Sequence, residues 1–183
     1  MKMFTKKNVA LVLSGGGARG MAHIGVIEEL EARGYTIKSV AGTSMGSLVG
    51  GVYAAGKMEE CKEWMFTLDK RKVFSLVDFT LSREGLVKGA KVFSEMKAII
   101  PEINIEELNI PYAAVAVDLV DNSEIVFKKG SLYEAIRASV SIPNVFTPVK
   151  SGDKVLTKEI MGEAFTDENS GVSTVHFEVW QER

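Results

Sequence analysis

The stretch Gly42-Thr43-Ser44-Met45-Gly46 decides the fold of this chain. It follows a short apolar run over residues 37–41 and leads into small and apolar residues over 47–55. This is the G-x-S-x-G pattern of a tight strand-to-helix turn, which exposes a serine hydroxyl to a substrate. Gly42 and Gly46 are expected to lack side chains because the turn brings the flanking backbone close to its neighbours. The free N–H groups of the helix start favour developing negative charge at the serine. The alternative is a Gly/Ser turn that carries no chemistry.

A second glycine-rich loop precedes this turn by one helix and one strand. Asn8–Leu13 is a valine- and leucine-rich run typical of a buried parallel strand, and it ends in Ser14-Gly15-Gly16-Gly17-Ala18-Arg19-Gly20. A helix is predicted from this loop to about Arg33, with Gly34 placed to end it. The order of strand, glycine loop, helix, strand and serine turn predicts a right-handed βαβ unit. Both loops then lie at the carboxyl edge of one sheet.

The rest of the chain continues the alternation of helices and strands. Helices are expected over residues 58–68, 89–100 and 132–138, and strands over 112–117, 124–127 and 175–180. The sequence therefore predicts an α/β domain with a mainly parallel central sheet flanked by helices.

Composition limits the classes of function. The chain has 183 residues, 46% hydrophobic and 25% charged, with a formal net charge of −2 and no long basic stretch, so we expect no nucleic-acid partner. The single cysteine, Cys61, excludes an internal disulfide and fits a reducing compartment. The apolar run near the N-terminus is too short for a signal peptide, and no run approaches the roughly 18 residues of a membrane span. These features predict a soluble, cytoplasmic protein.

The glycine loop admits two uses. Gly15-x-Gly17-x-x-Gly20 after a strand fits the dinucleotide fingerprint, but the second strand ends in Ser39-Val40-Ala41-Gly42 without the acidic residue that holds a ribose. Consecutive glycines also let backbone N–H groups converge on one small volume, where they can bind the oxyanion formed when a serine attacks an ester. The pairing of this loop with Ser44 favours the second use.

Together the two motifs resemble those of the patatin-like phospholipases, in their bacterial branch. The similarity continues through residues 21–26, 135–139, 142–143 and 146–149, and so covers about residues 8–156. The resemblance implies a three-layer α/β/α fold and hydrolysis of lipid or phospholipid esters by a Ser–Asp dyad. It implies no catalytic histidine, no metal and no diffusible cofactor, and it is compatible with transient contact with a membrane surface.

The resemblance also assigns roles to individual residues. Ser44 is the nucleophile, the backbone amides of Gly15, Gly16 and Gly17 form the oxyanion hole, and Arg19 helps to shape that loop.

The chain departs from the family where the catalytic aspartate belongs. That aspartate normally stands in an Asp-Gly-Gly or Asp-Gly-Ala motif, which falls near Lys158 and does not occur here. We therefore expect a patatin-like domain over residues 1–156 and a divergent tail over 157–183, in a relative that is truncated or altered in this region. The carboxylates close enough in sequence to substitute are Asp153, Glu159, Glu163 and Asp167, each expected to be a solvated surface group.

Three hypotheses follow from these motifs. The first is a serine acyl hydrolase acting through an acyl-Ser44 intermediate. The second is a catalytically weak or inactive relative that binds lipid or regulates, having kept the loops and lost the aspartate. The third is a nucleotide-binding Rossmann domain. A triad that includes His176 is disfavoured because only one βα unit precedes Ser44.

Overall fold

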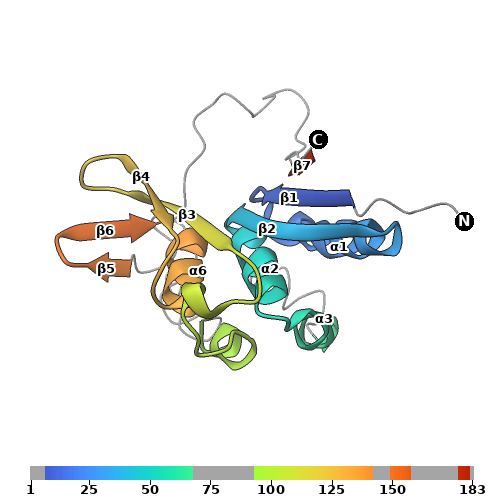
Figure 1. The fold of residues 1–183 in the computed structure, drawn as a ribbon. Helices are drawn as coiled ribbons and strands as arrows, with labels where there is room; N and C mark the ends of the chain where they lie inside the picture. Colours follow the sequence, from blue (N-terminus) through green and yellow to red (C-terminus); the bar gives the residue numbers. More distant parts are fainter. Residues whose placement is uncertain (1–6, 68–92, 142–148, 158–176, 182–183) are drawn as a thin grey trace, which may run out of the picture.

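A mixed sheet forms the centre of the computed structural model, which describes residues 7–67, 93–141, 149–157 and 177–181. Its strands lie in the order β5-β6-β3-β2-β1-β7, with β4 beside β3 (Figure 1). The strands are β1 (Lys7–Leu13), β2 (Tyr35–Thr43), β3 (Tyr112–Asp118), β4 (Ser123–Phe127), β5 (Val149–Ser151), β6 (Lys154–Thr157) and β7 (Phe177–Gln181). The central strands β1, β2 and β3 are parallel, and the strands added around them pair antiparallel.

Helices connect the parallel strands. A 3-10 turn, η1 (Gly17–Met21), leads into α1 (Ala22–Ala32) between β1 and β2, and α2 (Met45–Ala54) follows β2. The other described helices are α3 (Met58–Thr67), residues 93–99, the 3-10 turn η2 (Ile105–Glu107) and α6 (Leu132–Val140). Gly34 and Gly56, at φ of 78° and 70°, follow the ends of α1 and α2, a conformation that glycine adopts without steric cost.

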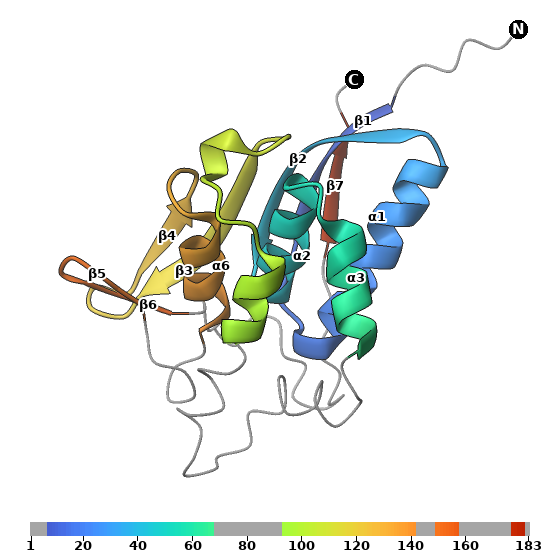
Figure 2. The same cartoon turned by 90° about the horizontal axis from the view of Figure 1, so that it is seen from below.

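The hydrophobic core lies between the sheet and these helices. The alternation of β1 directs Val9, Leu11 and Leu13 inward, where each is at most 2% exposed. They pack in one cluster with buried side chains of α1, α2 and α6, including Ile27, Val49, Val52 and Ile136. In the described part of the chain, α1, α2, α3 and α6 all cover this one face (Figures 1 and 2).

The opposite face of the sheet is more open. Val12 points to it with 42% of its surface exposed. A hollow of about 530 Å³ is lined there by residues of β1, β2 and β3, among them Ala10, Ala41 and Ala113, and at its rim by η2 and the loop that leads from η2 to β3. No described helix lies over this face, so the third layer of the expected sandwich is not among the described elements.

The α/β fold with a parallel sheet centre agrees with the prediction from sequence. The predicted strands and helices up to residue 67 are all present, and β2 extends the expected strand by two residues at each end. The β5–β6 hairpin was not predicted, because strands of three and four residues carry too little periodicity to recognise. The tail contributes β7, which pairs with β1 at the edge of the sheet.

Candidate active site

Ser44 stands on a strained turn between β2 and α2. Its backbone has φ of 52° and ψ of −122°, and Ser44 and Asn122 are the non-glycine residues with positive φ among those described. Such a conformation costs about 1–3 kcal/mol and persists only where the surroundings impose it. The residue is 7% exposed, so its hydroxyl lies in a confined position at the start of the helix.

The two flanking glycines are required by close backbone contacts. A Cβ on Gly42 would collide with the backbone of Gly46 and Ser47. A Cβ on Gly46 would collide with the carbonyl of Leu13 and would lie 2.6 Å from the carbonyl oxygen of Ser14. The first turn of α2 therefore rests directly on the end of β1 and on the start of the glycine loop.

Buried hydroxyl groups hold both polar backbone groups of Ser44. The Ser44 N–H donates to Ser139 Oγ at 2.8 Å, and Ser139 Oγ in turn donates to the Val115 carbonyl at 2.6 Å. On the other side, Ser47 Oγ donates to the Ser44 carbonyl at 2.7 Å. Tyr112 Oη donates to the Ser47 carbonyl at 2.7 Å, which ties the first turn of α2 to β3.

The glycine loop lies beside this turn. Leu13 at the end of β1 pairs with Gly42 at the end of β2, so the segments that follow the two strands are neighbours. The loop is closed by the Arg19 N–H, which donates to the Gly16 carbonyl at 3.1 Å, while the Arg19 side chain is exposed. Gly20 contacts Met45, the residue after Ser44, since a Cβ on Gly20 would lie 2.6 Å from Met45 Cβ.

His23 supports the loop from behind. It is fully buried in the first turn of α1, and its Nε2 donates to the Ser14 carbonyl at 3.0 Å; the proton is assigned to Nε2 because its partner is a carbonyl. Burial lowers the pKa of His23, and the hydrogen bond to Ser14 offsets this only in part. The imidazole is therefore neutral near pH 7, and its hydrogen bond ties the first turn of α1 to the Ser14 carbonyl at the start of the loop.

The described residues include neither a metal-ligand cluster nor a membrane-spanning helix. They contain no group of three or more His, Cys, Asp or Glu side chains that could hold a metal ion. None of the described helices is both long and apolar enough to cross a membrane. Met65 is 8% exposed, and Trp64 packs against the main core.

Comparison with known proteins identifies the family. The sequence profile described as "Patatin-like phospholipase" matches residues 11–167, which include the glycine loop and the Ser44 turn. The chain belongs to the patatin-like phospholipase family. Among solved structures, VipD from Legionella pneumophila shares the patatin-like fold with a TM-score of 0.50, 14% identity, and coverage of 84% of this chain and 45% of that one.

Curated relatives carry the same family name or that of the NTE family. An uncharacterised NTE family protein of Mycobacterium tuberculosis is 45% identical over 148 residues, covering 81% of this chain and 41% of the relative. The mouse patatin-like phospholipase domain-containing protein 6 is 31% identical over 153 residues, covering 81% of this chain and 11% of the relative. The chain thus spans about two fifths of the length of the mycobacterial relative and about one tenth of the length of the mouse relative.

In this patatin-like chain, the family's aspartate is expected just after β6, and the described residues of that segment end with Thr157. Thr157, the last described residue of β6, pairs with Val117, and its Oγ1 donates to the Ser141 carbonyl at the end of α6. Because β6 runs antiparallel to β3, the chain at Thr157 is heading toward Val115 and the level of Ser44. Glu159, Glu163, Asp167 and His176 lie outside the described residues.

Asp153 lies away from Ser44. It is an exposed residue of the turn between β5 and β6, which projects at the end of the sheet opposite β1 (Figure 1). Asp118 holds this hairpin: its Oδ1 accepts from the N–H groups of Val120 and Val155, each at 3.1 Å, and Lys154 Nζ lies 3.5 Å from its Oδ2. Through these contacts Asp118 joins the end of β3 to the β5–β6 hairpin.

Sequence reasoning missed the hydroxyl groups around Ser44. Ser139 lies within residues 135–139, which resemble the family, but the sequence assigns no role to its hydroxyl. The available signal was a serine beside Ala138, on the face of α6 whose other residues are apolar and buried. A polar side chain on such a face needs a partner, but the sequence does not say which.

Proposed function

We propose that this chain is a serine acyl hydrolase that cleaves carboxylic esters of lipids or phospholipids through an acyl-Ser44 intermediate. The observation that supports the proposal is the strained Ser44 turn packed against the glycine loop, at adjacent strand ends of one sheet. Backbone strain that is held by the surrounding structure clusters at functional sites, which favours a chemical role for this turn.

The proposed reaction uses the two loops together. Ser44 Oγ attacks the ester carbonyl and loses its proton to a base, and the carbonyl oxygen becomes an oxyanion that the amides of Gly15, Gly16 and Gly17 stabilise. Collapse of this intermediate expels the alcohol, which takes the proton from the protonated base. Water then attacks the acyl-serine by the same route and releases the fatty acid.

The base is the part of this site that the described residues do not supply. Among them, no carboxylate hydrogen-bonds the Ser44 hydroxyl, and Asp153 lies at the other end of the sheet. We expect the base to come from the segment after Thr157, where Glu159 is the first carboxylate. If no base is present, the oxyanion hole and substrate binding alone leave about 10³–10⁴-fold acceleration over water, which is the weak relative of the second hypothesis.

Hydrolysis of p-nitrophenyl esters of two to twelve carbons tests the proposal. The chain should release nitrophenolate, and Ser44→Ala should remove this turnover while leaving the circular dichroism spectrum and the melting temperature close to those of the unmodified chain. Glu159→Gln in parallel tests the expected source of the base. Turnover that survives Ser44→Ala would contradict the proposal. A folded chain that binds phosphatidylcholine vesicles without hydrolysing any ester would support the lipid-binding alternative.

A further inference from the structure

We propose that Ser139 is a positioning residue for Ser44: its hydroxyl bridges β3 and the serine turn, and so holds the nucleophile in its strained conformation. The inference rests on the proposed role of Ser44 as the nucleophile. It concerns a residue 95 positions away in the chain.

The hydroxyl of Ser139 fills a gap at the end of the sheet. The parallel ladder between β2 and β3 ends at the pair Thr43–Val115, beyond which the chain turns into α2. Ser139 Oγ lies between the strands at this point, accepts from the Ser44 N–H at 2.8 Å and donates to the Val115 carbonyl at 2.6 Å. One hydroxyl therefore satisfies the Ser44 N–H and also donates to the Val115 carbonyl, which accepts a second, longer bond from Thr43 Oγ1 at 3.5 Å.

The bond to the Ser44 N–H has no substitute among the described contacts. The Ser44 carbonyl accepts from the Ser47 and Leu48 N–H groups and from Ser47 Oγ, as expected at the start of a helix. The Ser44 N–H has Ser139 Oγ alone. The strain of Ser44 lies in its φ of 52°, and this angle changes when the peptide group that precedes Ser44 rotates. Rotation of that peptide would move the Ser44 side chain relative to the glycine loop.

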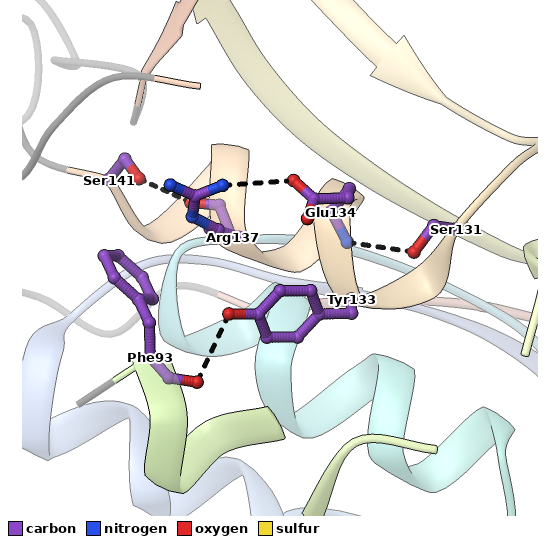
Figure 3. Close-up of polar contacts among 6 residues, drawn as sticks. All are labelled: Phe93, Ser131, Tyr133, Glu134, Arg137 and Ser141. Atoms are coloured by element: carbon purple, nitrogen blue, oxygen red, sulfur yellow. Dashed lines mark hydrogen bonds and ion pairs between the residues drawn. The ribbon is translucent and has the colours of Figure 1, made fainter. Parts of the chain in front are cut away.

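Several contacts hold α6 in place and thereby fix the position of Ser139. Figure 3 shows its outer contacts: Tyr133 Oη donates to the Phe93 carbonyl at 3.2 Å, and the Arg137 guanidinium lies 5.4 Å from the centre of the Phe93 ring. Ser131 caps the start of the helix, accepting from the Glu134 N–H. At its end, Ser141 Oγ donates to the Arg137 carbonyl at 2.6 Å. Ser139 itself is fully buried on the inner side.

The structure offers a matched control for testing Ser139. Ser141 lies two residues further along, is equally buried, and also donates through its hydroxyl to a backbone carbonyl, but its hydroxyl makes no bond to the Ser44 turn. Ser139→Ala and Ser141→Ala therefore remove the same group from the same helix end. Ser139→Thr keeps a hydroxyl. Ser139→Cys keeps the volume with a much weaker donor and acceptor, and serves if the alanine variant does not fold.

Two measurements on the full chain decide the inference. The first is hydrogen exchange of the Ser44 amide by NMR, which does not depend on activity. The second is the second-order rate constant for labelling Ser44 with a fluorophosphonate. In Ser139→Ala, or Ser139→Cys, we expect Ser44 exchange to accelerate at least about tenfold and labelling to slow by about 10–100-fold, since small misplacements of a reacting group cost this much. Ser141→Ala should change neither, and Ser139→Thr should recover part of both.

The outcomes separate this inference from the proposed function. If the unmodified chain is not labelled, the proposed nucleophile fails, and the exchange of the Ser44 amide alone decides whether Ser139 holds the turn. If labelling in the Ser139 variant is as fast as in the unmodified chain, Ser139 does not position Ser44 and the inference is overturned. Equal losses in the Ser139 and Ser141 variants would also overturn it, because they would show a general effect of destabilising the end of α6.

Discussion

Two regions of the sheet, around the β1–β2 pair and around the β5–β6 hairpin, are held by different kinds of contact. At the β1–β2 end, backbone lies directly on backbone, and neutral hydroxyls from Ser139 and Ser47 hold the strained Ser44. At the β5–β6 end, one buried carboxylate, Asp118, holds the hairpin through two N–H groups and Lys154. The conformation of the first region is stabilised by close backbone packing, and that of the second region by a charged carboxylate. Changes of shape and changes of pH should therefore affect the two ends differently.

The largest effect is expected from filling the space at Gly46. Gly46→Ala would drive a methyl group into the carbonyl of Leu13, and since backbone cannot move aside cheaply, we expect a loss of about 3 kcal/mol in the free energy of unfolding. The matched change is Gly25→Ala, at an exposed helical position with nothing near the new Cβ. It should raise the free energy of unfolding by about 0.5–1 kcal/mol. Urea denaturation measures both, and similar stabilities of the two variants would refute the steric account of the turn.

A smaller effect is expected from removing the charge of Asp118. Burial alone would raise its pKa, but the N–H donors of Val120 and Val155, together with the Lys154 ammonium, outweigh burial and hold the pKa below its ordinary value of 3.8. The stabilisation is thus present above pH 3.8 and is lost as pH falls through the lowered pKa. Asp118→Asn should have a lower melting temperature than the unmodified chain at pH 6, and the gap should narrow toward pH 3.

The exposed Asp153 supplies the control for this prediction. Asp153→Asn, in the turn of the same hairpin, should have the same melting temperature as the unmodified chain at pH 6, because the Asp153 side chain is exposed. Neither variant should alter labelling of Ser44. A constant gap between Asp118→Asn and the unmodified chain from pH 6 to pH 3 would show that the carboxylate is not held by charge.

The smallest effect is expected at His23. Its pKa lies below the ordinary 6.5 because of burial, so the folded chain resists a proton that the unfolded chain accepts. The stability contribution is complete above pH 6.5 and declines as pH falls toward the lowered value. The side-chain amide in His23→Gln can donate to the Ser14 carbonyl and does not titrate. The melting temperature of this variant should therefore change less with pH below pH 6.5 than that of the unmodified chain. A dependence of the melting temperature on pH that is the same in His23→Gln as in the unmodified chain would contradict this prediction.

The contrast between the two ends also explains what the sequence could predict. Gly42, Gly46 and the loop from Gly15 to Gly20 are specified by local sterics, so a short pattern suffices to place a turn, a loop and the adjoining strands. Ser139 cannot be found in this way, since its role exists only after α6 has packed beside a strand end far away in the sequence. The β5–β6 hairpin is not predictable from the sequence, because its strands are short and because it is held by Asp118, a contact that no local pattern encodes.

The most direct test of the central claim is the site of covalent labelling. The folded chain is treated with a fluorophosphonate, digested, and the adduct located by mass spectrometry, with Ser44→Ala as the control. We predict one adduct, on Ser44, that is absent from the variant. A folded chain that forms no adduct, or one modified at another serine with Ser44 untouched, would contradict the assignment of Ser44 as an activated nucleophile.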